Sequence, residues 1–280
     1  MRFEERALRF ACHDEALYGV ACIPESPSMR GVLIVVGGPQ YRVGSHRQFT
    51  LLARALAAQG IPAMRFDYRG MGDSDGPARS FEQVDDDLRA AIDAFQAALP
   101  AVREVVLWGL CDGACAALFY APQDARVAAL VLLNPWVRTE QGLAKATLKH
   151  YYRGRLAEPD LWRRMLRGQF NFARAAGSAL ALVRSAVVRV PARAGAPVAL
   201  PERMLAAAGQ FTRPLLIVLS GADLTAREFA DMAAASPAWR RLLDAPRVTR
   251  HTLDGADHTF SRRVWRDQVA RWTAEWVAAL

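Results

Sequence analysis

The sequence predicts an α/β protein in which a mostly parallel sheet is covered by helices on both faces. Short apolar runs alternate with amphipathic helical patterns through most of the chain, and this alternation is typical of parallel strands joined by helices. One apolar run, 104–108, leads through Gly-Leu-Cys-Asp-Gly into a helix of small residues. Two later apolar runs end just before acidic and histidine side chains. Because ligands of such sheets bind at the carboxyl ends of the strands, we expect these polar groups to meet there.

Residues 1–137 contain most of the expected elements. Two strands, near 7–12 and 17–23, are close enough in sequence to pair as a hairpin, and the apolar run 31–36 predicts a buried strand. Ser45 to Gln48 and Ser80 to Gln83 each match a capping box, the pattern that opens a helix. We therefore expect helices at 45–59, 80–98 and 112–120, and further strands at 63–68, 104–108 and 127–133.

Residues 138–212 depart from this alternation. They contain helical patterns interrupted by Pro and Gly, without a convincing strand. We predict a helical lid inserted between two parts of one core, 1–137 and 213–280. The second part is expected to hold strands at 214–219 and 247–253, a helix near 225–236 and a closing helix from about 261, which brings the sheet to eight strands.

The positive charge of the chain is concentrated in this insertion. The chain has a formal net charge of +8, and the stretch 138–213 carries fourteen Lys and Arg against four Asp and Glu. A solvated, arginine-rich cap explains this composition, and we favour that explanation. The functional alternative is attraction of an anionic or carrier-linked substrate, or peripheral contact with a membrane surface. The sequence has no aromatic-basic recognition motif, so nucleic acid is not an expected partner.

Cys111 is the candidate nucleophile. Gly109 and Gly113 flank it as in a nucleophile elbow, because the turn from strand to helix is tight and the helix passes close to the strand. A sulfur at this position lies at a helix N-terminus, where the backbone dipole favours a thiolate. The alternative is an inert buried cysteine, which is the role we expect for Cys115 one helical turn later.

Asp223 and His258 are the candidate acid and base. Each follows an apolar strand within a few residues, and the chain order nucleophile, acid, base is that of α/β-hydrolases. His258 would take the thiol proton, and Asp223 would fix the imidazole tautomer. Taken singly, both could be ordinary turn residues. Asp254 and Asp257 are nearer to the histidine in sequence, but close neighbours rarely form the orienting bond, so Asp223 is the preferred acid.

A second match to Gly-x-Ser-x-Gly, centred on Ser74, is interpreted as a loop. The preceding strand ends near Tyr68, and the next helix is expected only at Ser80. An elbow needs a strand and a helix directly on either side of the nucleophile. We therefore do not expect Ser74 to be the nucleophile.

Acyl chemistry also needs an oxyanion hole. The backbone N–H of Asp112, the residue after the nucleophile, is the first expected donor. The second should come from the loop after the third strand, where the proline has no N–H. This leaves Gly38, with Gln40 as the alternative. His46 and Arg47, at the start of the following helix, are expected either to line the mouth of the pocket or to cap the helix at the surface.

The cysteine count and the absence of several sequence motifs argue against a metalloprotein, a secreted or membrane protein, and a cofactor-dependent enzyme. Four cysteines, without metal-ligand spacing or disulfide density, predict no metal site and fit a reducing cytoplasm. The sequence has no signal-peptide pattern near its start and no apolar run close to the ~20 residues of a membrane span. A nucleotide-binding glycine loop is also missing, so we predict no cofactor.

Three segments point to a family. They are Gly-Gly-Pro-Gln-Tyr-Arg-Val-Gly-Ser-His-Arg-Gln-Phe at 37–49, the stretch from Asp67 to Ser74, and the Cys111 elbow. Together they resemble the exosortase A system-associated hydrolase 1 family, a bacterial group of the α/β-hydrolase superfamily found with exosortase and exopolysaccharide genes. The resemblance covers nearly the full length; its second segment is common across the superfamily and its first is more particular. It implies an α/β-hydrolase fold and a triad of Cys111, Asp223 and His258. The cysteine elbow is also similar to that of dienelactone hydrolases.

These observations predict acyl transfer through a Cys111 thioester. Attack of water on the thioester would make the protein an ester or thioester hydrolase, which is the preferred interpretation. Attack of an alcohol or amine would make it an acyltransferase acting on a saccharide or small metabolite. The alternative from another class is a non-catalytic binding protein on a hydrolase scaffold, because fold alone does not prove activity. The expected substrate is a small acyl ester or thioester.

Overall fold

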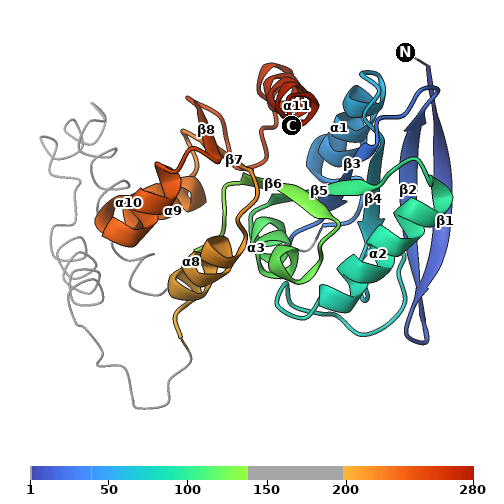
Figure 1. The fold of residues 1–280 in the computed structure, drawn as a ribbon, viewed down its shortest axis with the longest axis horizontal. Helices are drawn as coiled ribbons and strands as arrows, with labels where there is room; N and C mark the ends of the chain where they lie inside the picture. Colours follow the sequence, from blue (N-terminus) through green and yellow to red (C-terminus); the bar gives the residue numbers. More distant parts are fainter. Residues whose placement is uncertain (1, 39, 138–197) are drawn as a thin grey trace, which may run out of the picture.

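The computed structural model describes residues 2–38, 40–137 and 198–280. Its centre is one eight-stranded sheet with the strand order β1-β2-β4-β3-β5-β6-β7-β8 (Figure 1). Neighbouring strands from β4 to β8 pair in parallel, whereas β1 and β2 pair antiparallel with each other and β2 pairs antiparallel with β4. The predicted eight-stranded, mostly parallel sheet is confirmed. The strands are β1 (Phe3–Cys12), β2 (Glu15–Pro24), β3 (Arg30–Val35), β4 (Ala63–Asp67), β5 (Glu104–Leu110), β6 (Val127–Leu133), β7 (Leu215–Ser220) and β8 (Val248–Leu253).

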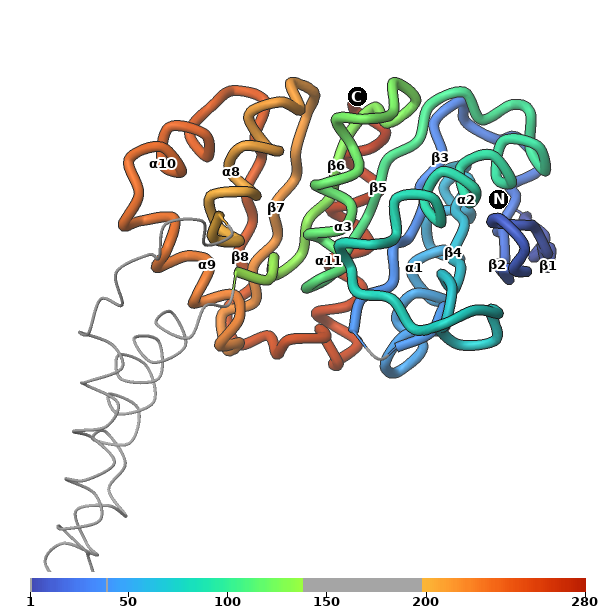
Figure 2. Tube along the Cα trace, turned by 90° about the horizontal axis from the view of Figure 1, so that it is seen from below, coloured from blue at the N-terminus to red at the C-terminus, as the bar shows by residue number. Residues whose placement is uncertain are grey.

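Helices cover both faces of the sheet (Figure 2). Side chains of α1 and α11 belong to one buried apolar cluster, and side chains of the other α-helices belong to a second cluster on the opposite face. The α-helices of the described residues are α1 (Gln48–Ala57), α2 (Asp85–Ala98), α3 (Asp112–Tyr120), α8 (Leu200–Gln210), α9 (Leu224–Ala235), α10 (Pro237–Leu243) and α11 (Arg263–Ala278). Short 3-10 turns, η1 (Ser45–Arg47) and η2 (Ala121–Gln123), complete the described elements.

The central strands are buried because both of their faces are covered. Every residue of β6 is buried, as are all residues of β5 after Glu104, and their sequences are correspondingly apolar runs rather than alternating patterns. At the hairpin edge, by contrast, β1 has mostly exposed or half-buried residues. The carboxyl ends of β5, β6 and β7 therefore lie in the well-packed part of the sheet, whereas β8, at the other edge, has only exposed and half-buried residues.

Both predicted capping boxes are wrong as helix starts. Ser45 opens only the 3-10 turn, and α1 begins at Gln48 without a side-chain cap. The reason is that His46 and Arg47 have left-handed backbone conformations, with φ of 53° and 59°. At the second box the Ser80 hydroxyl does contact the Gln83 side chain at 3.3 Å, but the turn it forms ends before α2 begins at Asp85.

The predicted lid at 138–212 is described only in its last part, since residues 138–197 lie outside the described residues. Within it, α8 packs against α3 and α10 and buries Met204, Ala207 and Ala208. The single helix expected near 225–236 is followed by a further helix, α10, because Ser236 caps a new start whose first residue is Pro237. In the part of the chain that the structure describes, no helix combines the length and apolar character needed to cross a membrane.

Candidate active site

Cys111 lies in the sharp turn between β5 and α3. Its backbone is in an unfavourable region, with φ of 61° and ψ of −121°, as is common where a residue is held for function. The turn needs its flanking glycines: a Cβ on Gly109 would lie 2.3 Å from the Gly113 carbonyl oxygen, and one on Gly113 would lie 2.6 Å from that of Val35. The Cys111 amide donates to the Leu133 carbonyl at 2.9 Å, which ties the turn to the end of β6.

The structure brings Cys111, His258 and Asp223 together. Nδ1 of His258 lies 2.9 Å from Oδ2 of Asp223, and the Cys111 side chain is close enough to the His258 ring to affect its pKa. The interactions with Asp223 and with Cys111, in that order, raise the pKa of His258 to about 10, although burial opposes this. The arrangement therefore favours a proton on the imidazole and connects a sulfur, a base and an acid in one chain of contacts.

Asp223 has two roles in this arrangement. Burial disfavours its charge, but the contact with His258 and the amides of Ala226 and Thr225 outweigh burial, so the pKa of Asp223 is lowered. The same Oδ2 atom accepts from the Ala226 amide at 2.9 Å and so caps the N-terminus of α9. The helix thus fixes the carboxylate that orients the histidine.

The two alternative acids do not contact the histidine ring. Asp257 instead accepts a hydrogen bond from the Ser261 amide at 2.9 Å and a second from its hydroxyl, which closes the turn before α11. Asp254 is exposed in the tight turn after β8. Ser74 lies in a loop rather than in a strand-to-helix turn. Its hydroxyl donates to the Asp67 carbonyl at 2.7 Å and accepts from the Tyr18 amide at 3.0 Å.

Asn134 is a site residue that sequence reasoning missed. Fully buried at the end of β6, with φ of 43°, it donates from Nδ2 to the Ser220 hydroxyl at 2.6 Å and to the His258 carbonyl at 3.0 Å. Its Oδ1 accepts from the Ser220 amide at 2.9 Å. Asn134 therefore joins the ends of β6 and β7 to the backbone of the histidine loop. The available signal was a polar amide placed directly after a wholly apolar strand.

The expected oxyanion donors are brought together, but they contact a carboxylate of the protein. The Gly38 amide donates to Oδ2 of Asp112 at 2.9 Å, and the Gly113 amide donates to Oδ1 of the same group at 3.0 Å. The Asp112 carboxylate also interacts with the Asp112 amide. Burial raises the pKa of this carboxyl in spite of the three amides. Gln40 was the alternative donor. Its side-chain oxygen accepts a hydrogen bond from the Ser45 amide at 3.2 Å.

A buried carboxylate, that of Asp67, holds the loop that carries Gly38. Asp67, fully buried at the end of β4, accepts from the Arg42 amide at 2.5 Å and forms an ion pair with the Arg42 side chain. The Arg42 guanidinium also contacts Asp73 at 2.6 Å. His46 and Arg47 lie exposed further along this loop. Burial raises the pKa of Asp257, but the hydrogen bonds from Ser261 and the Thr259 amide, together with the nearby His46, lower it overall.

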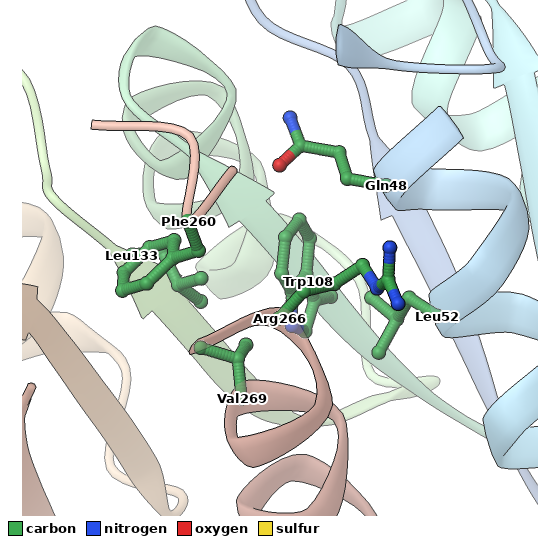
Figure 3. Close-up of a pocket in the computed structure, with 7 residues that line it drawn as sticks. All are labelled: Gln48, Leu52, Trp108, Leu133, Phe260, Arg266 and Val269. Atoms are coloured by element: carbon green, nitrogen blue, oxygen red, sulfur yellow. The ribbon is translucent and has the colours of Figure 1, made fainter. Parts of the chain in front are cut away.

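A small cavity of about 20 Å³ lies between β5, β6, α1 and α11 (Figure 3). Its lining includes Trp108, three residues before Cys111 in the chain, and Phe260, two residues after His258. The Gln48 amide projects toward this space in Figure 3, and its Nε2 has no hydrogen-bond partner among the described residues. Within the same residues, no three His, Cys, Asp or Glu side chains are grouped as metal ligands.

The sheet, its covering helices and the strand-to-helix turn at Cys111 define an α/β-hydrolase, a hydrolase type of enzyme. The chain belongs to the family described as serine aminopeptidase, S33, whose model matches residues 27–261. In this chain the turn between β5 and α3 carries a cysteine, Cys111.

Solved structures share this fold at low sequence identity. An esterase of Pyrococcus furiosus superposes with a TM-score of 0.66 and 15% identity, over 99% of this chain and 91% of that one. A dienelactone hydrolase of Anabaena variabilis gives a TM-score of 0.63 and 14% identity, over 100% of this chain and 99% of that one. The α/β-hydrolase GrgF of a Penicillium species gives 0.62 and 19%, over 98% of both chains.

A shorter stretch is more similar in sequence. It is 30% identical over 114 residues to the polyketide transferase GrgF of Penicillium. The match spans 39% of this chain and 38% of that protein.

Proposed function

We propose that the protein is an acyl-transfer enzyme that forms a thioester on Cys111, and that it acts as an ester or thioester hydrolase. The observation that carries this proposal is the contact chain from Asp223 through His258 to the Cys111 side chain, at the carboxyl end of the sheet. Membership of a hydrolase family supports the reaction class. The expected substrate is a small acyl ester or thioester.

In the proposed reaction, His258 holds the proton of the Cys111 thiol while the sulfur attacks the acyl carbonyl. A carbon–sulfur bond forms, and the electrons of the carbonyl double bond move to oxygen, where backbone amides stabilise the negative charge. The tetrahedral intermediate collapses, the alcohol or thiol leaves with the proton from His258, and the thioester remains. Water then attacks the thioester: His258 takes its proton, the carbon–sulfur bond breaks, and the acid is released.

Acylation of Cys111 should lower the pKa of His258. Part of the raised pKa of His258 comes from the Cys111 side chain. A thioester sulfur has neither a thiol proton nor a negative charge, so this part is lost and the pKa of His258 falls. A deprotonated imidazole becomes more available to activate water at the moment when a base is needed.

A second candidate function is transfer of the acyl group to an alcohol or amine. The local 30% identity to a protein named as a polyketide transferase favours it, and a thioester remains a good acyl donor to such acceptors. Measuring how the acyl group partitions between water and added alcohols or amines separates the two. Products of water attack alone would reject the transferase.

The test is intact-mass analysis after incubation with a panel of activated esters and acyl thioesters. We expect a covalent acyl adduct on the wild-type chain, and none on Cys111→Ala. Ser74→Ala should acylate like the wild type. An adduct that survives Cys111→Ala but disappears in Ser74→Ala would overturn the assignment of the nucleophile.

Alkylation with iodoacetamide tests the non-catalytic alternative. The Cys111 side chain is half-buried beside the His258 base, so Cys111 should be alkylated much faster than the buried Cys12 at pH 7. Burial raises the pKa of the Cys12 thiol to about 11, which makes it a matched internal control. Equal, slow alkylation of both residues, without any acyl adduct, would favour a binding protein.

A further inference from the structure

The carboxylate of Asp112 occupies the amides that should stabilise an oxyanion. The Gly38 amide contacts Oδ2 at 2.9 Å, the Gly113 amide contacts Oδ1 at 3.0 Å, and the Asp112 amide faces the same group. The amides of Gly38 and Asp112 are the two donors expected from the loop positions. A negatively charged oxygen of the protein is thus already bound where a negatively charged oxygen of the substrate must form.

The loop after β3 is shaped around this carboxylate. A Cβ on Gly37 would lie 2.2 Å from Oδ1 of Asp112, so a side chain at residue 37 would take its space. Gly38 has a φ of 61°, which directs its amide across the gap between the loop and the elbow. The buried Tyr68 is also near: its pKa is raised to about 12, first by burial and then by the charges of Asp112 and Asp87.

A purely local role accounts for only part of this geometry. An acidic residue in the first turn of a helix is stabilised by the helix dipole, and the Gly113 contact is of this kind. The Gly38 contact is different because it joins the elbow to a loop 74 residues earlier in the chain. Capping of α3 does not require it.

We propose that Asp112 is an internal substitute for the oxyanion, whose carboxylate closes the oxyanion hole in the free protein and is displaced when an acyl group reacts with Cys111. This inference rests on the proposed acyl-transfer function. It makes Asp112 a positioning residue: its side chain sets whether the Gly38 amide is available, while its own backbone amide is kept in every side-chain variant.

The energetic consequence is a competition between two acceptors. A carboxylate accepts hydrogen bonds from amides more strongly than a neutral carbonyl does. An ester in its ground state therefore gains little from the hole, and only an oxygen that has become negative competes with Asp112. Removal of the carboxylate should strengthen binding of a charged tetrahedral adduct.

The experiment uses an aryl trifluoromethyl ketone as the probe. The Cys111 sulfur adds to its carbonyl carbon, the thiol proton goes to His258, and the ketone oxygen becomes the oxyanion. The inhibition constant is measured for the wild type, Asp112→Ala and Asp112→Asn. Asp85→Asn, a first-turn carboxylate of α2 far from the site, is the matched control for helix-dipole effects.

We expect Asp112→Ala to bind the ketone about tenfold more tightly, the change that one freed hydrogen bond provides. Asp112→Asn should show a smaller gain, because its side-chain oxygen still accepts one amide. Asp85→Asn should bind like the wild type. A crystal structure of the wild-type adduct should show the ketone oxygen on the Gly38 amide and the carboxylate turned away.

Three outcomes would overturn the inference while leaving the proposed function intact. They are unchanged or weaker binding by Asp112→Asn in a folded protein, the same result for Asp112→Ala, and an adduct in which Asp112 still accepts from Gly38. Thermal melting establishes folding, and Asp112→Asn decides if Asp112→Ala does not fold. Failure of the proposed function looks different: the wild-type chain then forms no ketone adduct that Cys111→Ala abolishes.

Discussion

The two halves of the candidate site differ in how far they are assembled. In the acid–base half, Asp223 contacts the His258 ring and Asn134 holds the His258 backbone, both through buried groups. In the oxyanion half, the Gly38 amide is also held, but by the carboxylate of Asp112. In the proposed mechanism, the acid–base half is therefore ready in the free protein, whereas the oxyanion half must first exchange the Asp112 carboxylate for the substrate oxygen.

Different reaction steps depend on the two halves. Reactions that need only an activated sulfur, such as alkylation, depend on the acid–base half. Reactions that pass through a tetrahedral oxyanion depend on both halves, because they need charge stabilisation as well as a nucleophile. Variants in each half should therefore separate alkylation rates from binding of the ketone adduct.

The largest expected effect follows from Asp223→Asn. Loss of the carboxylate removes the main cause of the raised His258 pKa and allows the wrong imidazole tautomer. Ester turnover should fall roughly 10²–10⁴-fold, the usual contribution of a general acid–base pair. Single-turnover acylation measures it. Asp257→Asn, whose carboxylate contacts Ser261 instead, is the matched control, and an equal loss in both variants would contradict the assignment of the acid.

Asn134→Ala should weaken the acid–base half, because Asn134 holds the backbone of the loop that carries His258. It leaves the buried Ser220 amide without its partner and releases the His258 carbonyl. We expect a loss of about 2 kcal/mol in the free energy of unfolding, measured by urea denaturation, together with slower alkylation of Cys111. Ser220→Ala keeps the contact between Asn134 and His258, so it should lose only about 1 kcal/mol and retain the wild-type alkylation rate. Slow alkylation in Ser220→Ala but not in Asn134→Ala would refute this role.

Asp67→Asn should affect the oxyanion half alone. It weakens the buried ion pair with Arg42 that fixes the loop carrying Gly38. Because small displacements of a stabilising group are costly, we expect binding of the ketone adduct to weaken on the order of tenfold while alkylation of Cys111 is unchanged. Asp73→Asn removes an exposed partner of the same arginine and should have little effect. A parallel loss of alkylation in Asp67→Asn would mean that the two halves are not separable.

Much of the fold was predictable because it depends on local patterns. The apolar runs of β6 and β7 and the small residues of α3 identified these elements within a residue or two, since buried parallel strands and a helix close to a strand restrict composition strongly. The helix starts at Ser45 and Ser80 were not predicted correctly. Left-handed backbone at His46 and Arg47 is imposed by the loop as a whole and leaves no signal in a four-residue motif.

The candidate site divides in the same way. Cys111, Asp223 and His258 follow strands in an order that the sequence displays, so their meeting could be predicted from topology. The side chains of Asn134 and Asp112 act across long sequence separations, 124 residues to His258 and 74 to Gly38. Their partners depend on the relative heights of strand ends and loops, which the sequence pattern does not specify.

A further prediction is a pH dependence of stability that belongs to the acid–base half. The pKa of His258 is about 10 in the folded protein and about 6.5 in an unfolded chain, so the folded state holds the proton more tightly. The stability that this provides is fully present below about pH 6.5 and is lost as the pH rises toward 10. His258→Asn should therefore destabilise the protein more at pH 6 than at pH 10, measured by urea denaturation at each pH.

Since Asp223 is the first cause of the raised pKa of His258, the pH dependence should shrink in an Asp223→Asn background. An equal cost of His258→Asn at both pH values would show that the imidazole gains nothing from its partners, and the contrast between the two halves would then disappear.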